Sequence, residues 1–210
     1  MKIAVMGTGG VAAALGTRWA HLGHCIVFGS RDPQGGHIEQ LVLGAGDNAS
    51  AASIAEAAKD AEVVVLAVPW PAIQKVVEAA GDLSGKIVVD CSNPLNSEFT
   101  GLEFGHTTSA AEQIADWVPE AFVVKAFNTV STAVMADPKF GHEGAAVFVC
   151  GDNAHSVKVV SQLAEELGLE PVDAGPLPVA RYLEPLAMLY IHLAVRKGWG
   201  ANCAFKVLRR

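Results

Sequence analysis

A glycine-rich turn close to the N-terminus has the residue types and the spacing that bind a pyrophosphate. The apolar run from Lys2 to Met6 leads directly into Gly7-Thr8-Gly9-Gly10-Val11-Ala12. In a turn between a strand and a helix, Gly7 permits the tight bend, Gly9 lets a pyrophosphate approach the backbone, and Ala12 fills the third small position. Free N–H groups and the positive dipole at the start of the helix then hold the phosphate. The spacing predicts that a dinucleotide binds at Gly7, Thr8, Gly9, Gly10 and Val11.

The context of this turn decides between two interpretations. A similar glycine pattern also occurs in flexible loops and in packing turns between a strand and a helix. Here the pattern follows a β-type run and opens a helical segment from Val11 to His21, and Gly23 has the position of a C-cap. This context favours dinucleotide binding.

The second apolar strand, from Cys25 to Arg31, ends in residues that distinguish the two nicotinamide cofactors. A carboxylate at the end of this strand would bind the ribose 2′-hydroxyl, whereas the Ser30 hydroxyl and the Arg31 guanidinium suit a 2′-phosphate. We therefore expect NADP(H), bound by Ser30 and Arg31. The alternative is that Arg31 is a solvated turn residue and that Asp32 binds the hydroxyl of NAD.

No side chain is identified as a catalyst, and this absence bears on the chemistry. Lys125 has the type of a proton donor in a carbonyl reductase, although its place at a strand end favours a capping role. None of the seven histidines has the spacing of a metal ligand, so no metal site is predicted. Hydride transfer to a flavin or deazaflavin spreads the charge over a conjugated ring, so that positioning two stacked rings suffices. An isolated ketone would instead require a placed proton donor.

Strand-like and helix-like segments alternate along the chain and must position these residues. This order predicts an α/β fold, a Rossmann-type doubly wound and mostly parallel sheet with a short C-terminal helical extension. The composition, 51% hydrophobic and 18% charged, suits a sheet that helices cover on both faces. We expect an NADP-binding domain over residues 1–175 and an extension over residues 176–210 that completes the acceptor site and a dimer interface.

Further cofactor contacts are expected where strands end, because ligands of open α/β sheets bind at the carboxyl ends of the strands. The predicted strands 62–68, 86–90 and 121–125 are followed by the segments 68–70, 91–95 and 126–129. Asn and Thr often bond their own backbone at strand ends, which is the alternative for Asn93, Asn128 and Thr129. The predicted contacts at these ends are Val68, Pro69, Trp70, Asn93, Ala126 and Asn128.

Two runs give definite expectations for helices. The alanine-rich run from Ala51 to Lys59 predicts one helix. The run from Leu183 to Val195 predicts another, with Pro185 in its first turn and apolar residues almost all round beyond that turn. One sheet face covers only one stripe of a helix, so a second subunit is expected to bury the rest in a homodimer. The alternative is that this helix packs wholly against its own sheet.

Charge and cysteine content exclude several classes of partner. The net charge of −7 gives no support for binding to nucleic acid or to an anionic membrane. No apolar run reaches membrane-spanning length, and the first strand leaves no room for a signal peptide. The four cysteines are scattered without metal-ligand spacing, as in reduced proteins, and predict a cytoplasmic location.

Several runs resemble the NADP-dependent reductases that exchange hydride with coenzyme F-420, a deazaflavin. The matching runs cover nearly the whole chain and are Gly7 to Gly10, Gly29 to Arg31, Ala67 to Pro69, Asp90 to Leu95, Val123 to Thr129 and Gly175 to Leu193. Val124 to Thr129 and Pro171 to Leu177 are also similar to the cytosolic reductase domain of the six-transmembrane epithelial antigen ferric and cupric reductases, relatives that use flavin.

The resemblance implies an NADPH-dependent oxidoreductase with a flavin-like hydride acceptor. Coenzyme F-420 is the first choice, and a free flavin, or a ferric chelate reduced through flavin, is the second. Two alternatives are a small imine or hydroxyacid reductase and a non-enzymatic NADP-sensing module.

Overall fold

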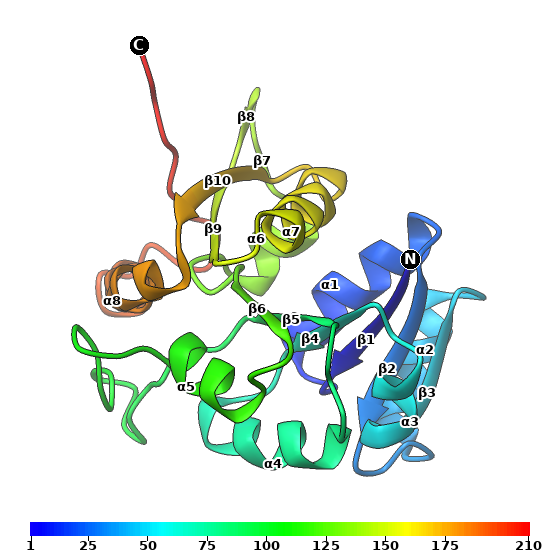
Figure 1. Cartoon of the computed structure of the whole chain (residues 1–210). Helices are drawn as coiled ribbons and strands as arrows, with labels where there is room; N and C mark the ends of the chain where they lie inside the picture. The colour runs from blue at the N-terminus through cyan, green and yellow to red at the C-terminus, as the bar shows by residue number, and fades with distance from the viewer.

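An eight-stranded sheet with helices on both faces forms the centre of the molecule (Figure 1). The computed structural model describes residues 1–210. The first half of the chain comprises β1 (Lys2–Met6), α1 (Gly10–His21), β2 (Cys25–Ser30), α2 (Gly36–Ala45), β3 (Ala49–Ser53), α3 (Ile54–Lys59), β4 (Val63–Leu66), α4 (Trp70–Ala80) and β5 (Ile87–Asp90).

The second half continues the alternation and adds a small hairpin. It comprises α5 (Ala110–Trp117), β6 (Phe122–Lys125), α6 (Thr132–Ala136), the hairpin strands β7 (Lys139–Phe140) and β8 (Glu143–Gly144), β9 (Ala146–Gly151), α7 (Ala154–Glu166) and β10 (Glu170–Gly175). A 3₁₀ turn (Leu177–Val179), α8 (Ala180–Ile191) and a π-helical segment (His192–Arg196) follow.

The strand order is β10-β9-β6-β5-β4-β1-β2-β3, so the chain winds outward in two directions from the centre of the sheet. Every neighbouring pair is parallel except β6 and β9, which are antiparallel. This confirms the predicted Rossmann-type, mostly parallel sheet. No helix has both the length and the apolar character required to cross a bilayer.

Two hydrophobic clusters, one on each face, hold the helices to the sheet. On one face, buried residues of α1, α6 and α7 pack around Trp19, whose indole N–H donates to the Leu163 carbonyl at 3.0 Å. On the other face, α3, α4, α5 and the start of α8 pack against the opposite side of the strands. Because both faces are covered, the strands present only their ends to a ligand.

The prediction of one helix from Ala51 to Lys59 is wrong at its start. Residues 49–53 form the edge strand β3, paired in parallel with β2, and the helix begins only at Ile54. The Ser53 hydroxyl accepts from the Glu56 N–H, and the Glu56 carboxylate accepts from the Ser53 N–H at 3.1 Å, which makes a capping box. Pairing with β2 and this cap therefore override the helix propensity of the alanines.

The C-terminal helix also differs from the prediction that placed Pro185 in its first turn. The helix α8 begins at Ala180, directly after the 3₁₀ turn, so Pro185 is its sixth residue and lies in its interior. The 3₁₀ turn fixes this earlier start, because its Val179 N–H donates to the Pro176 carbonyl at 2.9 Å and the chain then continues helically.

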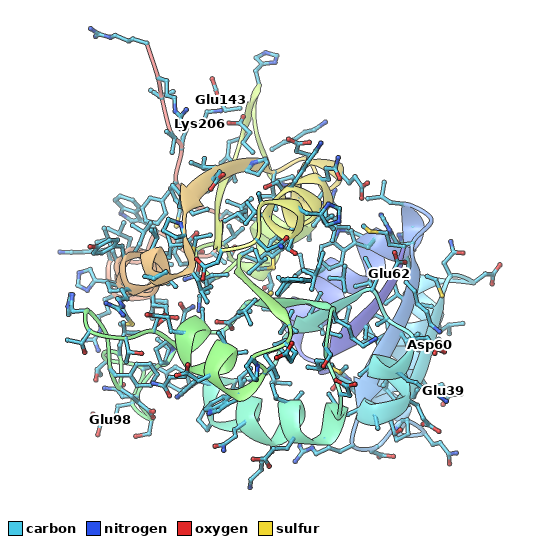
Figure 2. The ribbon with its side chains drawn as sticks, viewed as in Figure 1. Glu39, Asp60, Glu62, Glu98, Glu143 and Lys206 are labelled. Atoms are coloured by element: carbon cyan, nitrogen blue, oxygen red, sulfur yellow. The ribbon has the colours of Figure 1, made fainter.

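The C-terminal tail returns to the edge of the sheet after α8. The Ala146 N–H donates to the Phe205 carbonyl at 2.9 Å, and Lys206 forms ion pairs with Glu143 and Glu170. Figure 2 shows Lys206 and Glu143 close together above the sheet. The basic tail is thus partly neutralised by carboxylates of the same chain.

Candidate functional site

Two adjoining cavities lie at the carboxyl ends of the central strands. The first, the turn cavity, has a volume of about 370 Å³ and is lined by the glycine turn, the end of β2 and α4. The second, the aromatic cavity, has about 460 Å³ and is lined by Trp70, Phe99 and the segment after β5. Both are lined by Gly9, Ala67, Val68 and Pro69, so they form neighbouring parts of one site.

The glycine turn has the geometry that a pyrophosphate requires. Gly7 has a φ of +118°, and a Cβ atom added there would lie 2.7 Å from the Ala67 carbonyl oxygen. At Gly9 an added Cβ would meet nothing within 4 Å, so protein packing does not require a glycine at this position. Gly9 begins α1 without any side-chain cap, which leaves N–H groups at the helix terminus for an anion. The open space at Gly9 therefore fits a bound dinucleotide.

The end of β2 supplies positive charge to the turn cavity. Arg31 and Lys75 are the charged residues of its lining, which contains no carboxylate. Ser30, Arg31, Asp32 and His37 also line a neighbouring recess of about 400 Å³, and the Ser30 hydroxyl accepts from the Asp32 N–H at 3.0 Å. Two cations around an otherwise apolar and glycine-rich cavity suit a phosphate-bearing ligand.

The aromatic cavity has a rigid wall at the start of α4. Trp70 stacks on Trp117 with 5.6 Å between ring centroids and an interplanar angle of 18°. Its other neighbour, Phe104, makes an edge contact with a centroid distance of 5.3 Å. Trp70 thus lines the cavity in an orientation that two further rings hold.

A pair of asparagines fixes the segment after β5. The Asn93 side-chain amide donates to the Asn128 carbonyl, and the Asn128 amide donates to Asn93 Oδ1 and to the Leu183 carbonyl, each at 3.0 Å. Asn93 lines the aromatic cavity, whereas Asn128 lies behind it. These hydrogen bonds do not go to the local backbone of either residue, as the alternative expected, but join three segments of the chain.

The structure brings most of the predicted binding residues together. Gly7, Thr8, Gly9, Gly10, Val11, Ser30, Arg31, Val68, Pro69, Trp70 and Asn93 line one or both cavities. Ala126 and Asn128 are buried and line neither. Sequence reasoning missed several lining residues, among them Lys75, Phe99 and Glu103. The signal for Lys75 was its position in the helix that follows Pro69, whereas Phe99 and Glu103 lie in a loop without a recognisable motif. Leu95 ends the segment 91–95, which was expected at the cleft and does line it.

Lys125 lies in a fully buried charge cluster and lines neither cavity. Its Nζ donates to Asp90 Oδ2 at 2.8 Å, to Glu184 Oε1 at 2.7 Å and to the Ser92 carbonyl at 2.7 Å. Burial lowers the pKa of Lys125, but the Asp90 and Glu184 carboxylates outweigh this effect and raise its pKa above the usual value. A charged lysine without access to a ligand acts as a strand-end cap rather than as a proton donor.

Glu184 is a buried acid in a segment that sequence reasoning treated as apolar. Its carboxylate accepts from the Ala110 N–H at 2.9 Å, at the N-terminus of α5. Burial raises the pKa of Glu184, and the Lys125 ammonium opposes this rise. The only sequence signal was an acid within an apolar run. Its position shows that α8 contributes to the same cluster as β5 and β6.

No group of three or more histidine, cysteine, aspartate or glutamate side chains is arranged to hold a metal ion. Cys91 lines the aromatic cavity beside Asn93, and burial raises the pKa of its thiol. The cavity therefore offers a neutral thiol, amides and aromatic faces.

Comparisons with known proteins agree with this geometry. A family model described as NADP oxidoreductase, coenzyme F420-dependent, matches residues 2–94. The F420-dependent NADP reductase of Methanothermobacter marburgensis is 30% identical, over 93% of this chain and 93% of that protein. Metalloreductase STEAP3 of Rattus norvegicus is 36% identical over 90% of this chain, which spans only 37% of that protein. A crystal structure of a candidate F420-dependent NADP reductase from Arthrobacter sp. FB24 is 35% identical, covers 100% of both chains and has a TM-score of 0.91.

Proposed function

Because this chain belongs to the family of F420-dependent NADP reductases, and is therefore an NADP-dependent oxidoreductase, we propose that it passes hydride to a flavin-like ring. The cofactor is NADP(H). The first choice of acceptor is coenzyme F-420. The second is a free flavin, or a ferric chelate reduced through flavin, and the similarity to a metalloreductase supports it.

The adjoining cavities are the observation that carries this proposal. The turn cavity, with Gly9, Arg31 and Lys75, suits the phosphates of a dinucleotide, and the aromatic cavity leaves room for a planar ring beside it. When bound there, NADPH would supply a hydride from nicotinamide C4 to the acceptor ring, and the ring would take one further proton from solvent. The chain itself holds and orients the two rings and excludes water.

The side chains of the aromatic cavity favour a conjugated acceptor over a ketone. Its lining contains no lysine, arginine or histidine, and Lys125 is enclosed in its own cluster. A ketone reductase would need a proton donor at the carbonyl oxygen, whereas a conjugated ring spreads the arriving charge.

An anaerobic screen of NADPH oxidation tests the proposal. Coenzyme F-420, FMN, riboflavin, ferric chelates, cyclic imines and keto acids are offered in turn, and we expect turnover with the deazaflavin or the flavins. Turnover confined to imines or keto acids would establish the rival reductase. Tight NADPH binding without turnover on any acceptor would establish the sensing module.

We further propose that residues 1–175 form the NADP-binding unit and that residues 176–210 complete the acceptor site within a homodimer. In one chain, no residue of the second range lines either cavity. The same range exposes large apolar side chains, with exposed fractions of 71% at Tyr182, 49% at Leu189, 72% at Val195 and 62% at Trp199. A second copy that covers these side chains would bring α8 to the site of its partner.

Location and other partners follow from charge and cysteine chemistry. We propose the cytoplasm, because all four cysteines are free thiols, as in proteins of reducing compartments. The net charge of −7 supports partners other than nucleic acid or an anionic membrane, so a small redox acceptor and a second copy of the chain are the proposed partners.

A further inference from the structure

We propose that the loop 95–103 forms the subsite for the acceptor ring and that Glu103 keeps anionic groups out of it. The ligand class is then a planar conjugated ring whose phosphate or carboxylate substituents stay outside the aromatic cavity. This inference rests on the proposed hydride transfer to a flavin-like ring, and it names the part of the site that selects the acceptor.

The loop is an ordered wall rather than a loose connection. The Asn96 N–H donates to the Gly101 carbonyl at 2.9 Å, and the Asn96 side-chain oxygen accepts from the Thr100 N–H at 2.9 Å. Leu95 and Leu102 form an isolated antiparallel bridge at the base of the loop. These bonds close the loop on itself, so its tip has a defined position at the cavity.

Phe99 occupies the tip of this loop in a costly conformation. Its φ is +54°, and its side chain lines the cavity although 66% of it is exposed. A left-handed conformation is unfavourable for a residue that carries a Cβ atom, and the Phe99 ring belongs to neither hydrophobic cluster. An aromatic face held in this way, in the cavity that Trp70 also lines, suits a flat ligand that would cover it.

The two cavities carry opposite charge. Arg31 and Lys75 are the charged residues of the turn cavity, whereas Glu103 is the only charged residue of the aromatic cavity. Glu103 takes part in no ion pair of the molecule, and its N–H donates to the Pro94 carbonyl at 2.7 Å, which fixes the base of the side chain. The site thus attracts phosphates at one end and repels them at the other.

Comparing riboflavin with FMN distinguishes the effect of the flavin ring on binding from the effect of ligand charge. The two ligands share the same ring system, and only FMN carries a phosphate. Their dissociation constants are measured by quenching of flavin fluorescence at saturating NADP⁺. We expect Glu103→Gln to tighten FMN binding about three- to tenfold at low salt and to leave riboflavin within about twofold. At 0.5 M salt, the gain for FMN should shrink, since mobile ions screen the carboxylate.

Glu98→Gln is the matched control. Glu98 belongs to the same loop but lines neither cavity, and Figure 2 shows it on the outer side of the loop, away from the body of the protein. This variant changes the net charge equally and should shift neither dissociation constant by more than about twofold, since the Glu98 carboxylate lies on the outer side of the loop, where solvent screens its charge. An equal gain for FMN in both variants would overturn the local role of Glu103.

Phe99→Ala and Phe99→Leu test the ring subsite. Both variants should weaken the binding of riboflavin and of FMN to the same extent. The alanine variant should raise both dissociation constants by about two- to tenfold, since aromatic stacking contributes roughly 0.5–1.5 kcal/mol. NADPH affinity and melting temperature serve as folding controls and should stay unchanged. Unchanged flavin binding in both variants would overturn the subsite. Flavin binding that depends on Phe99 and Glu103 but never leads to reduction would instead refute the proposed function.

Discussion

Arg31 determines the preference for NADPH if its guanidinium binds the 2′-phosphate. We expect Arg31→Ala to weaken NADPH binding by one to two decades, since a charge-assisted phosphate contact contributes about 1.5–3 kcal/mol. NADH lacks this phosphate and is the internal control, so its affinity should change little. Fluorescence titration of both cofactors measures the effect, and an equal loss for both would contradict the assignment.

Valine variants at Gly9 and Gly7 distinguish a glycine required for cofactor binding from one required for folding. Gly9→Val should fold normally, because an added Cβ meets nothing within 4 Å and the φ of −79° suits valine, yet it should abolish binding of both cofactors. Gly7→Val should instead lose stability, because its φ is +118° and its Cβ would collide with the Ala67 carbonyl. Thermal melts and NADPH titration distinguish the two, and retained binding in Gly9→Val would show that the turn is misread.

At this scale, sequence reasoning located the cavity-lining residues whose positions depend on local spacing. The glycine turn and the pair Ser30 and Arg31 were predictable, because a strand-to-helix turn fixes their positions. Phe99 and Glu103 were not, because only closure of the loop by Asn96 brings them to the cavity. Glu184 was hidden for a similar reason, since its lysine partner lies 59 residues away.

The helices α5 and α8 are joined by an ion pair whose strength depends on pH. Glu112 accepts from Arg181 Nε at 2.9 Å, and the Arg181 hydrogen bond is the main cause that lowers the pKa of Glu112. The stabilisation is therefore complete above the ordinary Glu pKa of 4.5 and disappears as pH falls through the lower folded-state value.

Arg181→Gln should accordingly lower the melting temperature at pH 7 by no more than a few degrees, and the difference from the wild type should vanish in acid. Arg196→Gln is the control, because Arg196 forms no ion pair. Calorimetry between pH 7 and pH 3 measures the melting temperatures of both variants and of the wild type. A difference that stays constant over this range would exclude the ion pair as its cause.

Helices and strands were predictable wherever hydrophobic periodicity and turn residues agreed. The predicted ends of an element were wrong where contacts with residues distant in sequence determine them. Residues 49–53 form a strand because they pair with the otherwise unpaired edge of β2. No local sequence pattern predicts this pairing. The antiparallel direction of β9 has a similar origin, since it depends on where the segment after β6 returns to the sheet.

At the scale of the whole molecule, the homodimer is tested by its mass in solution. Sedimentation at micromolar concentration should give twice the chain mass of 21.9 kDa. Leu189→Lys should shift the measured mass toward that of a monomer, since a charge would enter the apolar contact. Leu43→Lys, on the exposed side of α2, is the control and should leave the mass unchanged. A wild-type monomer that still oxidises NADPH with an acceptor would contradict the proposal.

The buried cluster of Asp90, Lys125 and Glu184 has a consequence for the order in which the chain matures during synthesis. The glycine turn leaves the ribosome first, and Glu184 leaves last of the three cluster residues. Until it arrives, the Lys125 ammonium and the Ala110 N–H both lack the carboxylate that accepts their hydrogen bonds, and α8 is not yet present to bury the cluster. Nascent chains arrested before residue 184 should remain sensitive to protease and should not retain NADPH. Chains extended by a linker, so that residue 210 has left the ribosome, should resist protease and retain NADPH. We therefore expect competence to hold the cofactor to come late, although the residues proposed to bind it are made first.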